Sequence, residues 1–303
     1  MKRAPTKLKL VAGAAEPLVA FIARRGGISE EEAKAAVERG GAFLRGRRVR
    51  EPLAEVRKGD RVEVTLRPPQ EQPRLARERV LHLDPDLLAV DKPAGVSAQE
   101  DLAGGPALPQ LCEALLEELG EPATQALLVH RLDRGTTGVT LLARTKAAQA
   151  ALLEEFRAHR VQKEYRTLVS GSPPADAGVI DLSLGAGERG LRRADPQGES
   201  ALTRYRVLEK YPGATLIAAL PETGRTHQIR VHLGALGCPL LGDTRYGGPA
   251  FLTRADGARL ECARPLLHAL SLELRHPGGA RLSLAAPSPA DFEEACAWLR
   301  RSR

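Results

Sequence analysis

Apolar and polar positions follow one pattern in the first part of the chain and another in the rest. In the first part, Ser29 followed by Glu32 has the spacing of a helix capping box, which predicts a helix over residues 30–39. An alternating apolar and polar segment at 61–65 is typical of a strand. We therefore expect this part to fold as a small α/β module.

A proline-rich segment separates the two parts. Residues 68–73 read Pro-Pro-Gln-Glu-Gln-Pro, a sequence with no apolar period that disfavours regular structure. We predict a first domain over residues 1–67, a linker over 68–79 and a second domain over 80–303.

The second part carries more predicted strands than helices. Apolar positions recur at helical spacing over 109–119, 145–159 and 227–236. Apolar or alternating segments predict strands at 87–90, 139–143, 165–169, 201–208 and 215–220. Because strands outnumber helices and do not alternate strictly with them, we expect an α+β fold with a mixed, largely antiparallel sheet.

Positive charge is concentrated in the first domain. The chain has a formal net charge of +7, and residues 1–67 hold 16 Lys and Arg against 9 Asp and Glu. The whole excess therefore lies in this domain. Such a basic patch is typical of a protein that binds a polyanion, above all nucleic acid. A solvated basic surface without a specific partner would have the same composition.

The bulk composition argues against several other classes. No apolar run approaches the ~18 residues of a membrane helix. The basic N-terminus, with Glu16-Pro17 inside its apolar stretch, does not resemble a signal peptide. We expect a cytoplasmic monomer with no membrane partner. The four cysteines are far apart, which predicts free thiols instead of a zinc knuckle or disulfide framework.

One loop of the second domain holds a candidate for chemistry. His130-Arg131-Leu132-Asp133 continues into a Gly- and Thr-rich segment, and a carboxylate flanked by arginines should stay ionised and fixed in place. A structural salt bridge explains most such neighbourhoods. A metal site is a weaker alternative, because no third ligand follows at a recognisable spacing. We expect no metal.

A second segment with chemical potential precedes the helix predicted at 227–236. It reads Thr-Gly-Arg-Thr-His-Gln-Ile-Arg over 223–230. Thr226 is a candidate N-cap, and Arg230 would follow one turn later on the same face. A charged helix surface or a phosphate-binding helix N-terminus would fit equally. The Walker pattern is absent, which disfavours nucleotide hydrolysis and a nucleotide cofactor.

Five segments in order resemble the RluA-like family of RNA pseudouridine synthases. They lie between residues 80 and 290 and contain DKPAG, HRLDRGTTGV, KEYRTLVSG, ETGRTHQIRVHLGALGCPLLGDTRYGG and LLHALSLELRHP. The first domain resembles the small RNA-binding domain of ribosomal protein S-four in its capped helix and in GGAFLRGRRVREP and VRKGDRVEV. The resemblance implies a pseudouridine-synthase fold and an isomerase that uses no cofactor.

The resemblance also implies roles for particular residues. Asp133 matches the essential aspartate, Arg230 the basic residue that pairs with it, and Tyr165 the aromatic that packs on the target base. Arg131 matches an arginine that contacts RNA beside the flipped nucleotide. Further contacts with substrate or RNA are expected from His130, Lys163, Arg225, Thr226 and His227, and with RNA backbone from Arg45, Arg47, Arg48 and Arg50.

Three departures from the family pattern stand out. Thr136-Thr137-Gly138 replaces the usual Thr-Ser-Gly, and Gly135 stands where a polar residue is common. The segment 96–100 reads Val-Ser-Ala-Gln-Glu where the family often has histidine and proline. The last departure puts in doubt any function of that loop, but not the core chemistry.

The chemistry explains why these residue types are needed. Making pseudouridine breaks the N1–C1′ bond, turns the uracil and joins C5 to C1′, so the sugar carbon becomes electron-poor as in glycoside hydrolysis. Asp133 could attack C1′, stabilise its charge or remove the 2′ proton to form a glycal. Tyr165 would retain the free uracil by stacking, and could also help remove the C5 proton. Arg131 would fill the gap left by the flipped base.

We expect the substrate to be a structured RNA, and the basic appended domain favours ribosomal RNA of the large subunit over transfer RNA. Two other classes compete. A non-catalytic RNA-binding protein on the same fold would not need Asp133, Tyr165 and Arg230 together. A nucleoside or sugar hydrolase would lack a visible second acid and would leave the basic domain unexplained.

Overall fold

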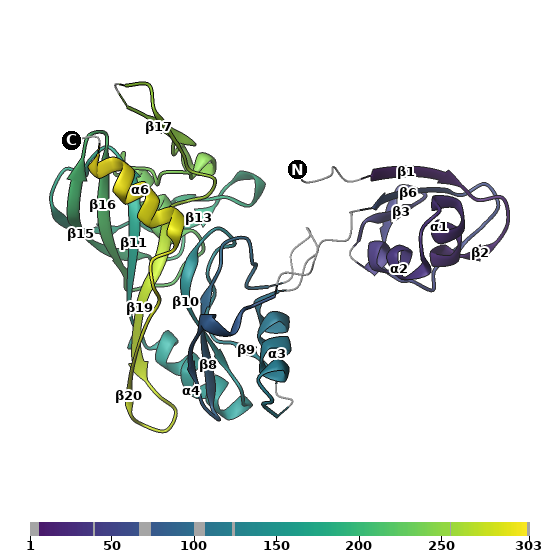
Figure 1. The fold of residues 1–303 in the computed structure, drawn as a ribbon, viewed down its shortest axis with the longest axis horizontal. Coiled ribbons are helices and arrows are strands. Elements are labelled where there is room, and N and C mark those ends of the chain that lie inside the picture. The colour runs from purple at the N-terminus through teal and green to yellow at the C-terminus, as the bar shows by residue number, and fades with distance from the viewer. Residues whose placement is uncertain are drawn as a thin grey trace. The chain divides into compact units, whose positions relative to one another are not determined.

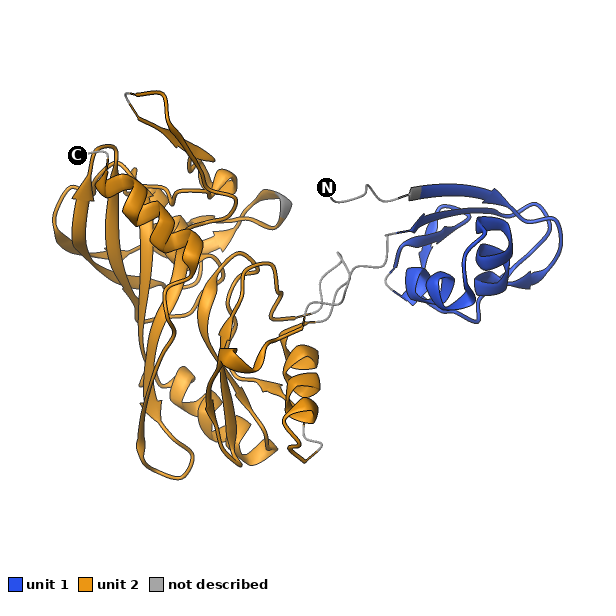
Figure 2. Ribbon diagram, viewed as in Figure 1, with its two compact units in different colours: residues 1–73, 100–106 blue, residues 74–99, 107–303 orange. Residues whose placement is uncertain are grey.

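The computed structural model describes residues 6–38, 40–66, 74–99, 107–122, 125–254 and 256–301. It divides into two compact units, residues 1–73 with 100–106 and residues 74–99 with 107–303 (Figure 2). The proline-rich segment 68–73 and Glu100 lie outside the described residues.

Unit 1 is built on a four-stranded antiparallel sheet with the order β1-β6-β3-β4. Its strands are β1 (Thr6–Val11), β3 (Ala42–Leu44), β4 (Arg47–Val49) and β6 (Arg61–Leu66), with a short pair β2 (Glu16–Pro17) and β5 (Glu55–Val56) beside them. Helices α1 (Leu18–Gly26) and α2 (Glu30–Glu38) pack together (Figure 1). Apolar side chains of both helices share one buried cluster with the sheet.

The capping box predicted at the start of α2 is present. The Glu32 backbone N–H donates to Ser29 Oγ at 3.1 Å, and the Ser29 backbone N–H donates to Glu32 Oε2 at 3.0 Å. Helix α1 was not predicted. Its N-cap is Pro17, which offers no side-chain cap, so no boundary signal precedes its apolar positions Leu18, Phe21 and Ile22.

Unit 2 holds one ten-stranded mixed sheet with the order β12-β15-β16-β11-β19-β10-β8-β7. Strand β20 pairs with β19, and β9 pairs with β10. These strands are β7 (Val80–Leu83), β8 (Leu87–Lys92), β9 (Leu127–Leu128), β10 (Thr137–Ala143), β11 (Gln162–Ser170), β12 (Ala177–Asp181), β15 (Leu202–Tyr211), β16 (Ala214–Pro221), β19 (Leu267–Arg275) and β20 (Arg281–Ala285). Only β10–β19 pairs in parallel within the described sheet, so the expected α+β fold with a largely antiparallel sheet is confirmed.

Four α-helices accompany this sheet among the described residues: α3 (Leu108–Glu118), α4 (Lys146–Arg157), α5 (Gln228–Ala235) and α6 (Ala290–Arg300). Alternate residues of β8 point into different cores. Leu87 and Ala89 share a cluster with α4, whereas Leu88 and Val90 share one with α3. Because helices cover both faces of β8, its first four residues are all apolar and do not alternate with polar ones.

The remaining elements of unit 2 are short. Two hairpins project from it, β13–β14 (Leu184–Ala186, Arg192–Ala194) and β17–β18 (Phe251–Thr253, Arg259–Glu261) (Figure 1). Three 3-10 turns occur in the described chain: η1 (Arg77–Arg79), η2 (Glu188–Gly190) and η3 (Thr244–Tyr246). Among the described residues, no helix is both long and apolar enough to cross a bilayer.

Strand β10 begins at a close backbone contact. Gly138 pairs with Lys92 of β8 and with Ala269 of β19, and its φ is +111°. A Cβ at this position would lie 2.1 Å from the Ala269 carbonyl oxygen. Only glycine therefore allows β10 to lie between its two neighbours where the preceding loop, residues 130–136, enters the sheet.

Replacing Gly138 by alanine should lower the free energy of unfolding by more than about 3 kcal/mol, because the new methyl group meets backbone that cannot move away. Gly171→Ala is a matched control: Gly171 also has positive φ, +73°, but open space around it. That change should cost about 1–2 kcal/mol. Urea denaturation measures both values, and equal losses would contradict the steric explanation.

Candidate active site

The loop that carries Asp133 lies between β9 and β10, so a short strand that was not predicted separates it from α3. His130 anchors the loop to β10 and α4. Its Nε2 accepts the backbone N–H of Leu141 at 2.8 Å, and its ring stacks on Phe156 at 4.9 Å between centroids. Burial lowers the pKa of His130 to about 3. This histidine is therefore neutral and braces the loop.

A second anchor comes from the end of β8. The fully buried Lys92 donates from Nζ to the carbonyl oxygens of Pro93 and Val96 at 3.1 and 2.9 Å. The Gly95 backbone N–H donates to the Arg134 carbonyl oxygen at 2.8 Å. Burial lowers the pKa of Lys92 to about 7. The backbone just before the segment that departs from the family pattern is thus tied directly to the loop that carries the carboxylate.

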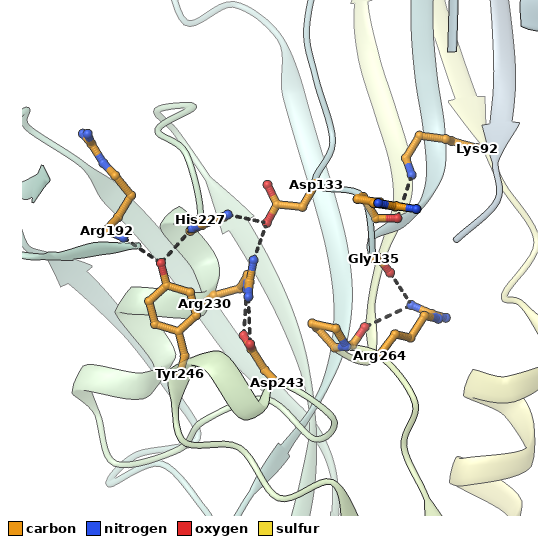
Figure 3. A network of polar contacts seen from close by, with 11 residues as sticks. Lys92, Asp133, Gly135, Arg192, His227, Arg230, Asp243, Tyr246 and Arg264 are labelled. Atoms are coloured by element: carbon orange, nitrogen blue, oxygen red, sulfur yellow. Dashed lines mark hydrogen bonds and ion pairs between the residues drawn. The ribbon is translucent and has the colours of Figure 1, made fainter. Parts of the chain in front are cut away.

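A third anchor is Arg264, which is 9% exposed. Its Nη1 donates to the carbonyl oxygens of Gly135 and Leu267 at 3.1 and 3.2 Å. Its Nε and Nη2 donate to the two carboxylate oxygens of Asp291 in α6 at 2.7 and 2.8 Å. Arg264 therefore connects the C-terminal helix to the loop, and Figure 3 shows its contact with Gly135.

Asp133 itself is held by Arg230 of α5. Arg230 Nη1 donates to Asp133 Oδ2 at 3.0 Å. The other side of the guanidinium forms a bidentate pair with Asp243, with Nε–Oδ2 at 2.7 Å and Nη2–Oδ1 at 2.8 Å (Figure 3). Arg230 is 6% exposed and Asp243 is 1% exposed. Burial opposes the charge on Arg230, but hydrogen bonds and negative charge from Asp243 and Asp133 raise its pKa.

Asp243 was not singled out from the sequence. It follows Gly242, which has φ of +79°, and it comes immediately before η3. A single aspartate between Gly242 and Thr244 has no distinguishing pattern. Its partner on α5 is known only once the fold brings the two together.

The prediction of Thr226 as the N-cap of α5 is wrong. The cap position is His227, in the left-handed conformation with φ of +58° and no capping hydrogen bond from its side chain. Gln228 orders the preceding turn instead, because its Oε1 accepts from the Arg225 backbone N–H at 2.9 Å and from the Thr223 hydroxyl at 2.7 Å. Thr226 is left exposed.

These segments surround a cavity of about 460 Å³. Eight of the predicted site residues line it: His130, Arg131, Asp133, Lys163, Tyr165, Arg225, His227 and Arg230. Thr226 is not among the lining residues. The four arginines predicted to contact RNA backbone, Arg45, Arg47, Arg48 and Arg50, belong to unit 1.

Two residues that line the cavity have pKa values shifted from those of the free side chains. Burial, with a smaller contribution from the negative charge of Asp133, raises the pKa of Tyr165, so its phenol keeps its proton. Burial also lowers the pKa of Lys163 to about 8, and its Nζ donates to the Thr223 carbonyl oxygen at 3.0 Å. Tyr165 is thus suited to stacking, and poorly suited to serve as a phenolate base for the C5 proton.

The two arginines at the cavity rim have protein partners. Arg131 is exposed, and its Nη1 donates to Gln99 Oε1 at 3.0 Å. Arg225 donates to Glu199 Oε2 and to the Ser200 carbonyl oxygen, both at 3.0 Å. In the part of the chain that the structure describes, no three His, Cys, Asp or Glu side chains form a group able to hold a metal ion.

Comparison with known proteins identifies the family. Residues 86–235 match the family described as RNA pseudouridylate synthase. Ribosomal large subunit pseudouridine synthase C of Vibrio cholerae serotype O1 is 37% identical over 225 residues, which cover 74% of this chain and 70% of that protein. The chain belongs to the RluA family of RNA pseudouridine synthases. It is therefore an isomerase that converts uridine to pseudouridine.

Further relatives of this pseudouridine synthase agree. The Escherichia coli protein of the same name is 34% identical, with 79% of its length covered and 83% of this chain. The solved structure titled Human RNA Pseudouridylate Synthase Domain Containing 4 is 27% identical with a TM-score of 0.60, and the match covers 74% of this chain and 93% of that one. The resemblance of the second domain to this family is confirmed.

The Asp243 carboxylate should be needed for full activity of the synthase because it fixes the guanidinium that holds Asp133. Asp243→Asn leaves the buried Arg230 with one charged partner, which should lower the free energy of unfolding by about 3 kcal/mol. Turnover should fall at least tenfold because the carboxylate loses its fixed direction. Urea denaturation and tritium release from 5-tritiated uridine in RNA measure the two effects.

Asp256→Asn is the matched control. Asp256 also forms an ion pair with an arginine, Arg254, but it is exposed, so its loss should cost less than about 1 kcal/mol. It should leave turnover unchanged. Wild-type turnover in Asp243→Asn would show that Arg230 needs no second carboxylate.

Proposed function

We propose that this synthase modifies specific uridines in ribosomal RNA of the large subunit, with Asp133 as its essential residue. The proposal rests above all on one observation: at the wall of the cavity, Asp133 is aimed by a buried arginine at 3.0 Å. The choice of RNA is supported by the names of the relatives, which include ribosomal large subunit pseudouridine synthases C and D.

Asp133 acts on the sugar as the N1–C1′ bond breaks. An ionised carboxylate can attack C1′, stabilise its developing positive charge or take the 2′ proton. All three routes need a charged carboxylate in a fixed position, which Arg230 provides through a charge-assisted hydrogen bond. The reaction is an isomerisation, so its atoms and electrons balance without a cofactor.

Tyr165 stacks on the target uracil and keeps it in the cavity after the bond breaks. Its position in the cavity lining and its protonated phenol support this role. An aromatic ring provides apolar contact together with a polar edge. His130 contributes by bracing the loop, and Lys163, Arg225 and His227 contribute contacts from the other walls.

Arg131 holds the flipped state of the RNA. Unstacking a base costs a few kcal/mol, and a long cationic side chain at the cavity rim can fill the gap and bind phosphate. The contact of Arg131 with Gln99 holds the guanidinium at the rim. Gln99 lies in the segment that departs from the family pattern, so this segment would act through Arg131. Thr226, exposed beside the rim, is a further RNA contact.

The first domain, an S-four-like module over residues 1–67, binds the RNA. A linker over residues 68–79 joins it to the catalytic domain over residues 80–303. Arg47, Arg48 and Arg50 form no ion pair within the described residues. Arg45 differs, since it makes a bidentate pair with Asp60 at 2.7 and 2.6 Å. Arg45 would therefore contact RNA only weakly. We propose that the protein acts as a cytoplasmic monomer.

Asp133→Asn should abolish activity while leaving the fold intact, because the amide is nearly isosteric but cannot supply negative charge. Tritium release from 5-tritiated uridine in ribosomal RNA should fall by at least 10³-fold, with the melting temperature close to that of the wild type. Asp256→Asn again serves as the control. Full activity in the Asp133 variant would refute the assignment of this residue.

Neutralising three arginines of the first domain should weaken RNA binding without slowing the bound enzyme. In Arg47→Gln/Arg48→Gln/Arg50→Gln, the slope of log K against log salt should become shallower by about 2–3, because each lost phosphate contact removes roughly one counterion. The Kd for ribosomal RNA should rise at least tenfold at moderate salt. Filter binding over a salt series measures both values.

The control for this experiment removes the same net charge from the same domain. Lys9, Arg24 and Lys34 are paired with Glu63, Glu16 and Glu38, so replacing these three by glutamine should change the slope little. Equal slopes in both triple variants would mean that the domain binds through net charge alone.

Mapping pseudouridines in total RNA, with and without the gene, tests the substrate. Loss of sites in large-subunit ribosomal RNA supports the proposal. Loss of sites confined to transfer RNA would replace it with a transfer RNA synthase. An unchanged map together with RNA binding would indicate a non-catalytic RNA-binding protein on this fold.

A further inference from the structure

His227 occupies a backbone conformation that its sequence would not favour. Its φ of +58° and ψ of +17° are left-handed, and its side chain caps no backbone N–H of α5. Strain of this kind persists only where the surroundings hold the residue, and such positions cluster at functional sites. In this conformation the imidazole ring lies between Tyr246 and Asp133 (Figure 3).

Tyr246 determines which ring nitrogen of His227 carries the proton. The Arg192 backbone N–H, which can only donate, lies 2.8 Å from the phenol oxygen. The phenol proton is therefore free to be donated to His227 Nδ1, 2.7 Å away. Burial raises the pKa of Tyr246, so this proton is retained. With Nδ1 as an acceptor, the neutral ring carries its proton on Nε2.

Tyr246 is itself held firmly. It ends η3, three residues after Asp243. The Arg230 guanidinium lies over its ring at 4.7 Å from the centroid, and the His227 ring meets it edge-on at 5.5 Å. The residues that fix Asp133 also fix the tyrosine.

The Nε2–H of His227 lies on the side of the ring that faces Asp133. The Nε2 nitrogen lies 3.8 Å from Asp133 Oδ2, too far for a hydrogen bond, and His227 lines the cavity. Within the described residues this N–H has no hydrogen-bond acceptor. Burial lowers the pKa of His227 against the opposing charge of Asp133. The ring is thus a neutral donor beside the carboxylate, and it does not compete with Arg230 as a second cation.

We propose that His227 Nε2–H donates a hydrogen bond to uracil O2 as the N1–C1′ bond breaks, and that Tyr246 is the positioning residue that holds His227 in this tautomer. This inference rests on the proposed role of Asp133. O2 is bonded to C2, the neighbour of N1, so it lies close to C1′ while the N1–C1′ bond breaks, and it receives part of the electron pair that leaves with the base. A fixed donor at that point stabilises the developing charge.

The step balances without proton transfer by the histidine. The electron pair of the N1–C1′ bond leaves with the uracil, and His227 keeps its proton throughout. When C5 joins C1′, the proton lost from C5 is matched by one gained at N1. The donor is useful on each of the three routes open to Asp133, because the base departs in all of them.

Tyr246→Phe tests the positioning role. Without the hydroxyl, the His227 tautomers are no longer restricted, so kcat should fall about tenfold while KM for ribosomal RNA stays within twofold. Tyr211→Phe is the matched control, since its hydroxyl donates to Glu209 outside the site at 2.7 Å. This control should keep the wild-type kcat. Nitrogen-15 NMR of labelled histidine should show His227 protonated at Nε2 alone in the wild type, and at either nitrogen in Tyr246→Phe.

His227 variants test the donor itself. His227→Ala should lower kcat about 100-fold, whereas His227→Gln, whose side-chain amide also donates, should recover part of that loss. Melting temperatures of all variants separate unfolding from lost chemistry. A common kcat for the alanine and glutamine variants would show that the ring has only a packing role.

The two proposals fail in different ways. An inactive wild type would refute the proposed function, while the NMR experiment would still report the tautomer. An active wild type with unchanged kcat in Tyr246→Phe, or with a change in KM alone, would overturn this inference and leave the role of Asp133 intact. Protonation of His227 at Nδ1 in the wild type would also overturn it.

Discussion

The site depends on one arginine held between two carboxylates. Asp243 takes two of the three guanidinium nitrogens of Arg230, which fixes the plane of the group and leaves Nη1 as the donor toward Asp133. Removing these charges from water is costly, and the cost is recovered only when the geometry is good and the hydrogen bonds are made. The bidentate pair meets that condition, so the direction of the Asp133 carboxylate follows from that of a buried neighbour.

The fold brings these groups together from separate segments. Asp133 precedes β10, Arg230 lies in α5 and Asp243 comes before η3. The entry of β10 into the sheet depends on the missing side chain of Gly138, and Arg264 ties the same loop to α6. A change in any of these supports would move the carboxylate relative to the guanidinium. Several elements of unit 2 therefore act together to fix the distance between the Asp133 carboxylate and the Arg230 guanidinium.

How much of this could be predicted depends on whether a feature is local. The capping box at Ser29 is local, and so is the apolar run of β8, and both are present in the structure. Helix α1 was not predicted, because it has no capping side chain that would mark its start in the sequence. The cap of α5 was misassigned to Thr226, because a left-handed His227 is stabilised by a tyrosine distant in sequence. Asp243 and Tyr246 could not have been found from a short pattern, since their partners lie on other elements.

Burial sets the pKa values of several groups that line the cavity. In each of these groups it disfavours the charged form. Lys163 has its pKa lowered to about 8, His227 has its pKa lowered, and Tyr165 has its pKa raised. Arg230 is the exception, because two carboxylates raise its pKa. In the mechanism proposed above, the charge that develops as the base leaves is met by the Asp133–Arg230 ion pair and by the neutral His227 ring, in surroundings where each interaction is stronger than it would be in water.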